Sequence, residues 1–210
     1  VPGDMLEVRV LDVEIRVPYG VNATGPGSDT APDLLAEATQ KIIKLDLKRN
    51  VALFSQEVEV PLAPFMGIVA VAPPPELKRV STKPPGAFGG NIDFRHLVAG
   101  STLYLPVFNE GALFYTGDGH ACQGDGEVDG TAIEISLTPT VQLIVHPRGG
   151  AKMKWPRAED PDVVGGARVD DDARLPNGLP RVAAIREHRD LGHAPLIAAL
   201  GERDFGNRGG

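Results

Sequence analysis

Cysteine, aromatic side chains and basic residues are all scarce in this sequence. The chain of 210 residues has a single cysteine, Cys122, so it cannot form an internal disulfide. Disulfide-free chains are typical of reducing compartments, and we expect a cytoplasmic protein. Only 21 Lys and Arg stand against 28 Asp and Glu, which gives a formal net charge of −7. Because phosphate backbones and anionic lipids are bound by basic surfaces, we expect no nucleic-acid partner and no membrane partner.

Long hydrophobic runs are also lacking. No stretch approaches the roughly 20 apolar residues that a membrane-spanning helix needs. The sequence opens on Val1 rather than on methionine, and we expect an upstream segment to be missing. With 42% hydrophobic residues, a chain of this length can bury a core. We expect one β-rich domain over residues 1–162, incomplete at its N-terminus.

Short alternating segments separated by glycine and proline dominate the first 146 residues. Alternation of apolar and polar positions favours half-buried strands, and regularly spaced short strands favour an all-β fold. We therefore predict a mainly β protein, a β-sandwich or barrel-like domain with few short helices. The predicted strands are Met5–Ile15, Lys41–Leu47, Val51–Phe54, Val58–Val60, Pro64–Ala72, Thr102–Val107, Ala112–Thr116, Thr131–Leu137 and Val141–His146.

Two segments lack this pattern. Residues 18–33 carry several Gly, Pro, Asn, Ser and Asp, which predicts a long surface loop with a short helix over Pro32–Thr39. Residues 163–210 are rich in Arg, Asp and Gly. They predict a divergent tail, irregular or disordered, whose one helix would cover Leu179–Arg189.

The segment Gly117–Glu127 is the strongest candidate for chemistry, because it combines acidic side chains and a histidine with closely spaced glycines. Asp118 and His120 are two residues apart, so they share a face in a strand and can converge in a turn. Carboxylate and imidazole groups are ligands for divalent cations, which predicts a metal pair in a loop held between two strands. The alternative is an ordinary turn, with the aspartate bonded to backbone amides beside a surface histidine.

Neighbouring polar residues extend this candidate site. Glu127 would be either a further ligand or the general base, and Gln123 would either donate to a developing oxyanion or bond to nearby backbone. A second pair lies in an extended segment, where Asp93 would complete the metal shell and Asn91 would bind a substrate. A simple turn after two glycines would also explain that pair.

Two further residues receive a structural interpretation. Cys122 has no assured base beside it, so we expect a small packing residue rather than a thiolate nucleophile. Glu134 falls between Ile133 and Ile135, so alternation points its side chain to the face opposite theirs, which is ordinarily exposed to water.

Five motifs in order resemble the acetamidase/formamidase family, and the resemblance extends over most of residues 1–162. The motifs are Gly89–Asp93, Leu103–Val107, Gly111–Phe114, Gly117–Ala121 and Gln123–Glu127. The resemblance implies hydrolysis of a short linear amide such as formamide or acetamide to a carboxylate and ammonia, with metal-activated water as the nucleophile.

The resemblance also implies a set of roles. Asp118, His120 and Asp93 would be metal ligands, Glu127 and His120 catalytic residues, and Asn91 and Gln123 substrate-binding residues. The metal would be zinc, with calcium or manganese as alternatives, and the protein would be a homo-oligomer. The alternative hypothesis is a catalytically inactive β-rich fragment that acts as a binding or structural domain.

Overall fold

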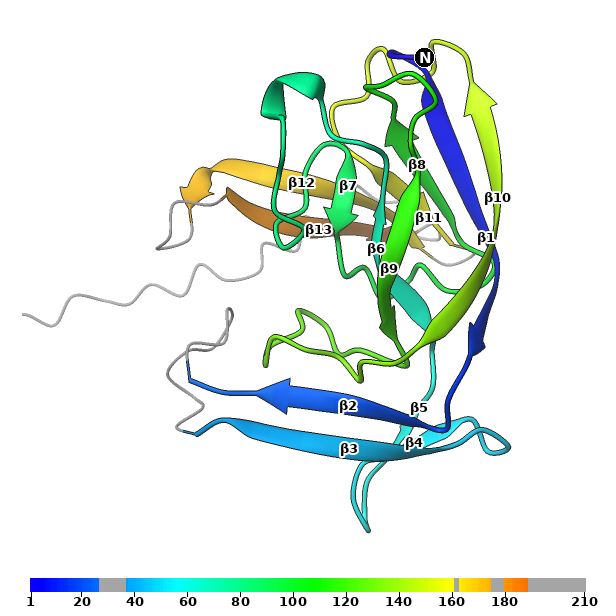
Figure 1. Ribbon diagram of the computed structural model, residues 1–210, viewed down its shortest axis with the longest axis vertical. Coiled ribbons are helices and arrows are strands. Elements are labelled where there is room, and N and C mark those ends of the chain that lie inside the picture. Colours follow the sequence, from blue (N-terminus) through cyan, green and yellow to red (C-terminus); the bar gives the residue numbers. More distant parts are fainter. Residues whose placement is uncertain (27–36, 161–162, 175–179, 189–210) are drawn as a thin grey trace, which may run out of the picture.

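The computed structural model describes residues 1–26, 37–160, 163–174 and 180–188, with the backbone alone for the last two ranges. The described part is built from antiparallel strands and one short 3₁₀ turn, Pro75–Leu77 (Figure 1). No helix among these residues has the length and apolar character to cross a membrane. The strands are β1 Met5–Ile15, β2 Tyr19–Thr24, β3 Thr39–Asp46, β4 Val51–Leu53, β5 Glu59–Pro61, β6 Phe65–Ala70, β7 Gly89–Asn91, β8 Thr102–Pro106, β9 Tyr115–His120, β10 Leu137–His146, β11 Arg157–Glu159, β12 Val163–Arg174 and β13 Pro180–His188.

These strands form three sheets. The largest has the order β10-β1-β8-β11-β12-β13, the second the order β2-β3-β4-β5, and the smallest the order β7-β6-β9. In the small sheet β6 is central, so it brings β7 and β9 to its two edges although they are far apart in sequence. The sheet with β2 and β3 lies below the other two in Figure 1.

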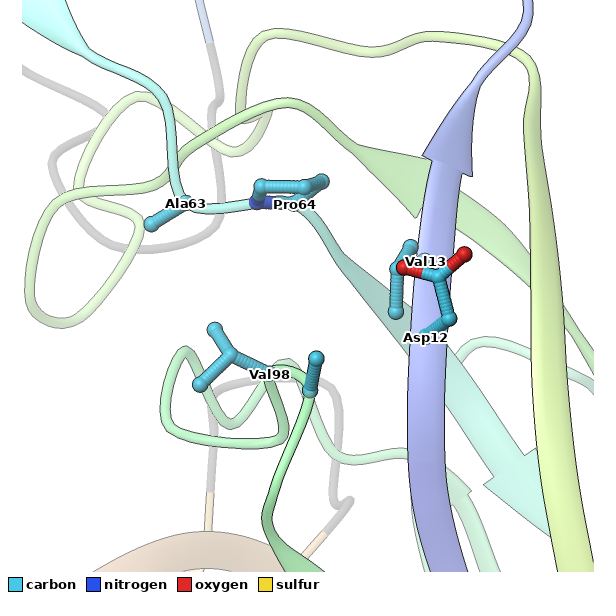
Figure 2. A pocket seen from close by; sticks show the side chains of 6 residues that line it. Asp12, Val13, Ala63, Pro64 and Val98 are labelled. Atoms are coloured by element: carbon cyan, nitrogen blue, oxygen red, sulfur yellow. The ribbon is translucent and has the colours of Figure 1, made fainter. Parts of the chain in front are cut away.

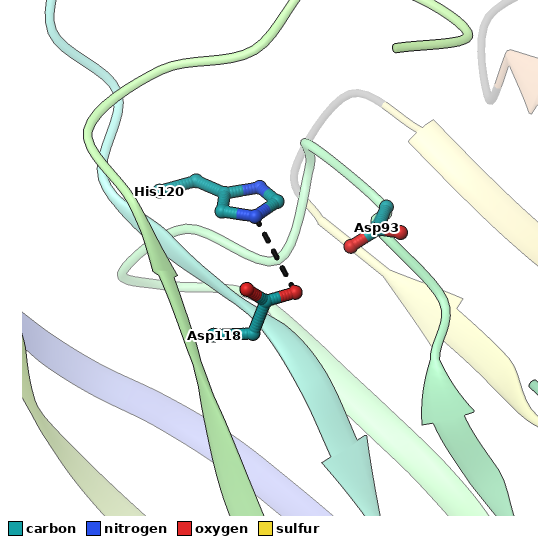
Figure 3. Close-up of side chains that lie close together, drawn as sticks. All are labelled: Asp93, Asp118 and His120. Atoms are coloured by element: carbon teal, nitrogen blue, oxygen red, sulfur yellow. Dashed lines mark ion pairs between the residues drawn. The ribbon is translucent and has the colours of Figure 1, made fainter. Parts of the chain in front are cut away.

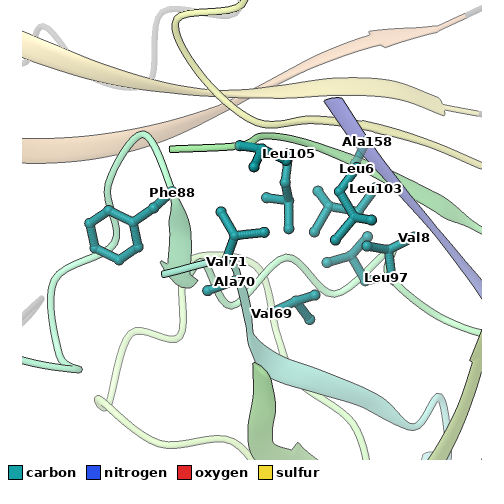
Figure 4. Close-up of a cluster of buried hydrophobic side chains, with 11 residues drawn as sticks. Leu6, Val8, Val69, Ala70, Val71, Phe88, Leu97, Leu103, Leu105 and Ala158 are labelled. Atoms are coloured by element: carbon teal, nitrogen blue, oxygen red, sulfur yellow. The ribbon is translucent and has the colours of Figure 1, made fainter. Parts of the chain in front are cut away.

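Two hydrophobic cores hold these sheets together. The first joins the large sheet to β6, with Leu6, Leu105 and Val69 among its buried side chains (Figure 4). The second lies against the four-stranded sheet and includes Ile43 and Ile133. Packing of one sheet face on another is the arrangement of a β-sandwich, so the predicted mainly β fold is confirmed.

The alternation predicted for β1 is present. Its core-facing side chains Leu6, Val8 and Val10 are buried, whereas Arg9 and Leu11 are exposed. The strand lies between β8 and β10 and pairs with both. A hydrophobic face of this kind fixes the register, because a shift by one residue would turn all three core side chains to water.

Four local predictions are wrong. β2 occupies the predicted loop over residues 18–33, and β13 occupies the predicted helix Leu179–Arg189. Thr131–Leu137 forms isolated bridges instead of a strand before β10 begins. The strand predicted over Ala112–Thr116 starts at Tyr115, because Ala112 and Leu113 have positive φ angles of 57° and 54° in a turn. Most of the helix predicted over Pro32–Thr39 falls outside the described residues, and Thr39 begins β3.

Glu7 is a buried carboxylate on the face of β1 opposite the core. It is 5% exposed and contacts both Arg9 and His146. Burial favours the neutral acid, but hydrogen bonds from His146 and Arg9 outweigh it and hold the pKa of Glu7 below its usual value. A carboxyl pKa that is lower in the folded state stabilises the fold above the unfolded-state pKa and stops doing so as pH falls through the folded-state value.

We therefore expect Glu7→Gln to lower the free energy of unfolding by about 1–2 kcal/mol at pH 7, and the gap to wild type to close below about pH 4. Urea unfolding at the two pH values measures this. Glu14→Gln is the matched control, because Glu14 pairs with Arg16, the residue just after β1, but both side chains are more than half exposed. An equal loss in both variants, or a gap that persists in acid, would contradict the assignment.

Candidate functional site

The candidate residues converge where the small sheet ends. Asn91 is the last residue of β7, Asp93 follows it by two positions, and Asp118 and His120 lie on β9. Because β6 pairs with both strands, it brings the two predicted clusters together. Asp93, Asp118 and His120 point toward one another in Figure 3.

The segment Gly117–His120 is part of β9 and not a loop, which corrects the prediction of a loop between two strands. In this strand the side chains of Asp118 and His120 point to the same face, as their spacing requires. Phe65 of β6 is opposite His120, and their rings meet edge to face at 5.0 Å. The loop proper begins after His120.

A glycine on β6 leaves the space that the cluster occupies. A Cβ atom at position 67 would lie 2.5 Å from Oδ1 of Asp93, 2.7 Å from Oδ2 of Asp118 and 3.0 Å from Cε1 of His120. Real Cβ atoms essentially never approach other atoms within 3.0 Å, so a side chain at Gly67 would displace both carboxylates and press against the imidazole. Gly67 also accepts backbone hydrogen bonds from Ile92 and Asp93 through its carbonyl oxygen.

His120 is the most enclosed member of the cluster, with a relative exposure of 1%. Its Nε2 atom lies 3.5 Å from Oδ2 of Asp118 and 3.3 Å from Oε2 of Glu134. Its Nδ1 atom lies 2.9 Å from Oε1 of Gln123. One ring nitrogen therefore faces carboxylates, and the other faces an amide.

Glu134 is a member of the site that the sequence analysis missed. Alternation assigned it to water, but isolated bridges place it opposite both His120 and Val21 of β2. Oε1 of Glu134 accepts the backbone N–H of Ala132, which leaves Oε2 directed at His120. No local pattern predicts this position, because it depends on two strands distant in sequence.

The other predicted residues lie around this centre. Glu127 can offer a carboxylate oxygen within 4.8 Å of ligand atoms of His120 and Glu134. Asn91 donates from Nδ2 to Oδ2 of Asp93 at 2.7 Å. Gln123 donates from Nε2 to the backbone oxygen of Asp93 at 2.8 Å, so both ends of its amide are bound within the protein.

Concentrated negative charge governs the electrostatics of the cluster. Burial, together with repulsion from neighbouring carboxylates, raises the pKa of Asp93 and of Glu127, with His120 opposing. Burial alone would favour neutral imidazole, but hydrogen bonds to Asp118 and Glu134 outweigh it and raise the pKa of His120 to about 10. Four carboxylates thus surround one cationic ring.

Three of these residues adopt a strained backbone. The φ angles of Asp93, Asp118 and Glu127 are 41°, 60° and 44°, in the left-handed region that side chains other than glycine rarely adopt. Such conformations cost on the order of 1–3 kcal/mol each and persist where the surroundings enforce them, often at functional sites. Asp93 and Asp118 direct their carboxylates at the space beside Gly67.

This donor set suits a divalent cation. Asp93, Asp118 and His120 each offer one ligand atom, all within 4.8 Å of one another, and His120, Glu127 and Glu134 form a second such group. Oδ1 of Asp93 is buried with no hydrogen-bond partner, which is costly unless a cation or proton satisfies it. Carboxylate oxygens with a single imidazole fit zinc, manganese or calcium.

Comparison with known proteins identifies the family. Residues 77–161 match the model of the acetamidase/formamidase family. A segment of 48 residues is 48% identical to an acetamidase of Mycolicibacterium smegmatis, and covers 23% of this chain and 12% of that protein. A predicted acetamidase/formamidase from Thermoanaerobacter tengcongensis has a TM-score of 0.73 at 29% identity, over 81% of this chain and 55% of that one. The sequence match and the shared fold together support the acetamidase/formamidase family for this chain.

A second solved member of the family agrees. An acetamidase from Bacillus halodurans has a TM-score of 0.72 at 30% identity, over 80% of this chain and 55% of that one. The chain thus spans little more than half the length of these solved relatives. All five ionisable residues of the cluster lie within residues 77–161, the region that matches the acetamidase/formamidase model.

Two other features lie outside the carboxylate and imidazole cluster. Cys122 is 7% exposed and packs in the second core, and burial raises the pKa of its thiol, which disfavours the thiolate. A separate apolar pocket of about 360 Å³ has Asp12 as its one ionisable lining residue (Figure 2). Its other lining residues are Val13, Ala63, Pro64, Val98 and Ala99.

We expect Gly67→Ala to weaken zinc binding by at least about tenfold, because the added methyl group would push apart the two carboxylates and the imidazole. Gly117→Ala is the matched control, since a Cβ at this neighbouring position in β9 would meet no atom within 4 Å. Competition with a chromophoric chelator measures the affinity of each variant. Equal affinities for the two variants would show that the space beside Gly67 is not the cation site.

Proposed function

We propose that this protein hydrolyses the C–N bond of short linear amides, such as formamide and acetamide, to a carboxylate and ammonia. The observation that carries the proposal is the carboxylate and imidazole cluster around His120, which lies within the region that matches the family model. The names of the relatives, acetamidase and formamidase, point to the same substrate class.

The residues that would hold a divalent cation are Asp93, Asp118 and His120. Their ligand atoms lie within 4.8 Å of one another, and Gly67 leaves open the space that they face. A cation bound there would supply Lewis acidity, which polarises an amide carbonyl and acidifies water. Zinc is the preferred metal, with calcium or manganese as alternatives.

Glu127 would act as the general base. In the reaction, water attacks the carbonyl carbon, a C–O bond forms, and the C–N bond breaks. Glu127 would take a proton from the attacking water and pass it to the nitrogen, which leaves as ammonia. Its raised pKa brings its proton affinity closer to neutral pH, where such transfers are efficient.

Glu134 would have a different task. Its Oε1 atom is held by the N–H of Ala132 and its Oε2 atom faces Nε2 of His120, so both oxygens have partners near the cluster. A carboxylate fixed in this way orients its neighbours better than it shuttles protons. Asn91 holds Oδ2 of Asp93, and its proposed contact with the substrate amide would involve its remaining carbonyl oxygen.

A second function is a β-rich domain that binds metal without turnover. The supporting observation is that the match covers only 55% of each of these two solved relatives. Leu143 and Val145 of β10 pair with the buried Val8 and Leu6 of β1, yet their own side chains are 46% and 56% exposed. The cytoplasmic location and the homo-oligomer stay predictions.

We expect the purified chain to release ammonia from formamide or acetamide only with bound zinc, after chelator treatment has removed metal. Asp118→Asn and His120→Ala should each lower kcat/KM by at least about 100-fold, since each removes a ligand. Asp12→Asn, on the separate pocket, is the control. Zinc binding without ammonia release would favour the second function, and metal-independent release would contradict the proposed role of the cation.

Substitutions of the two glutamates should differ in their effects on kcat and on zinc affinity. We expect Glu127→Gln to lower kcat by about 10²–10⁴-fold, the usual contribution of a general base, with zinc affinity close to that of wild type. Glu134→Gln should instead weaken zinc binding, because Oε2 of Glu134 faces Nε2 of His120. Measuring ammonia release and zinc affinity on both variants tests the division, and the reverse pattern would exchange the two roles.

A further inference from the structure

We propose that Gln123 is a positioning residue that fixes the protonation pattern of the His120 ring and its place relative to Asp93. The inference rests on the cation site of the proposed function. It assigns Gln123 to the protein's own framework, and not to the substrate contact that its sequence position suggested. Two hydrogen bonds, one at each end of its amide group, carry the argument.

The first hydrogen bond fixes the direction of the amide. One end of the Gln123 side chain lies 2.8 Å from the backbone carbonyl oxygen of Asp93. A carbonyl oxygen only accepts hydrogen bonds, so the end of the amide that faces it must be the NH₂ group. The carbonyl end, Oε1, is therefore the one that faces His120.

The second hydrogen bond fixes the ring. Oε1 of Gln123 lies 2.9 Å from Nδ1 of His120, and an amide oxygen only accepts, so Nδ1 must carry a proton. When the ring is neutral, its lone pair is then on Nε2. That atom faces Oδ2 of Asp118 and Oε2 of Glu134, the side of the ring on which the carboxylates gather.

The residues around His120 hold its ring in this orientation. His120 is 1% exposed, and the ring of Phe65 packs against it edge to face at an interplanar angle of 83°. A 180° flip of the imidazole would place Cδ2 against Oε1 of Gln123 and break the hydrogen bond. The amide thus selects one ring nitrogen for the cation.

Gln123 also sets the distance between two proposed ligands. It follows β9 and reaches the peptide of Asp93, which follows β7, so it connects the two edges of the small sheet. The backbone of Asp93 is held from the other side, where its N–H donates to the carbonyl oxygen of Gly67. Loss of Gln123 would free both the ring and the loop that carries Asp93.

The test compares Gln123→Met, which removes both hydrogen bonds at similar size, with Gln123→Glu, which keeps an acceptor for Nδ1–H. The control is Asn109→Leu, because the amide of Asn109 also donates to backbone carbonyls, those of Ala72 and Pro73, without touching the cluster. The readouts are zinc affinity, the ¹⁵N and ¹H resonances of the His120 ring, and the melting temperature.

We expect Gln123→Met to weaken zinc binding by about 10–100-fold, the usual effect of losing a residue that orients a ligand. Gln123→Glu should recover part of this loss, and Asn109→Leu should bind zinc like wild type even where its melting temperature falls. The Nδ1–H resonance of the zinc-loaded protein should shift in Gln123→Met and stay in place in Asn109→Leu. Wild-type affinity in Gln123→Met, or an equal loss in Asn109→Leu, would overturn the inference.

The same measurements distinguish a failure of the proposed function from a failure of the inference about Gln123. If wild type binds zinc but releases no ammonia, the same variants still test the role of Gln123 through affinity and ring resonances. If wild type binds no zinc, the Nδ1–H resonance of the metal-free protein decides, because its hydrogen bond to Gln123 does not require metal. A resonance that does not move in Gln123→Met would then overturn the inference.

Discussion

The absence of a side chain at Gly67 is the constraint on which the site depends. β6 lies between β7 and β9, so any side chain pointing to this face at position 67 would fill the space where Asp93, Asp118 and His120 meet. The same residue accepts the N–H of Asp93 through its carbonyl oxygen. One glycine therefore both opens the space and holds the loop that carries a carboxylate into it.

Charge balance accounts for the shifted pKa values of the residues around this space. The His120 cation faces Asp118 and Glu134, while burial and mutual repulsion raise the pKa of Asp93 and Glu127. A single imidazolium compensates only part of this negative charge. A divalent cation would replace protons in the cluster and satisfy the buried Oδ1 of Asp93, so the electrostatics and the unmet hydrogen-bonding capacity favour the same ligand.

Local patterns predicted those parts of the fold that local forces determine. The alternation over Met5–Ile15 predicted β1 with both of its ends, because burial of every second side chain is a property of the strand itself. The segment Gly117–His120 looked like a turn because it carries two glycines, yet pairing with β6 makes it a strand. Glu134 could not be predicted, since its direction depends on bridges to His120 and Val21. Gln123 was left between two roles that only its contacts distinguish.

The proposed cation binding and the proposed turnover depend on different groups of residues. The five ionisable groups of the cluster come from one stretch, residues 93–134, and β6 supplies the open space. The contacts of His120, Gln123 and Asp93 are likewise internal to the described residues. The proposed cation site thus uses only groups that are present here, whereas the proposed catalysis would also need a substrate pocket. Zinc affinity and ammonia release would therefore report on different groups of residues, so a variant that loses one without the other assigns its residue to binding or to turnover.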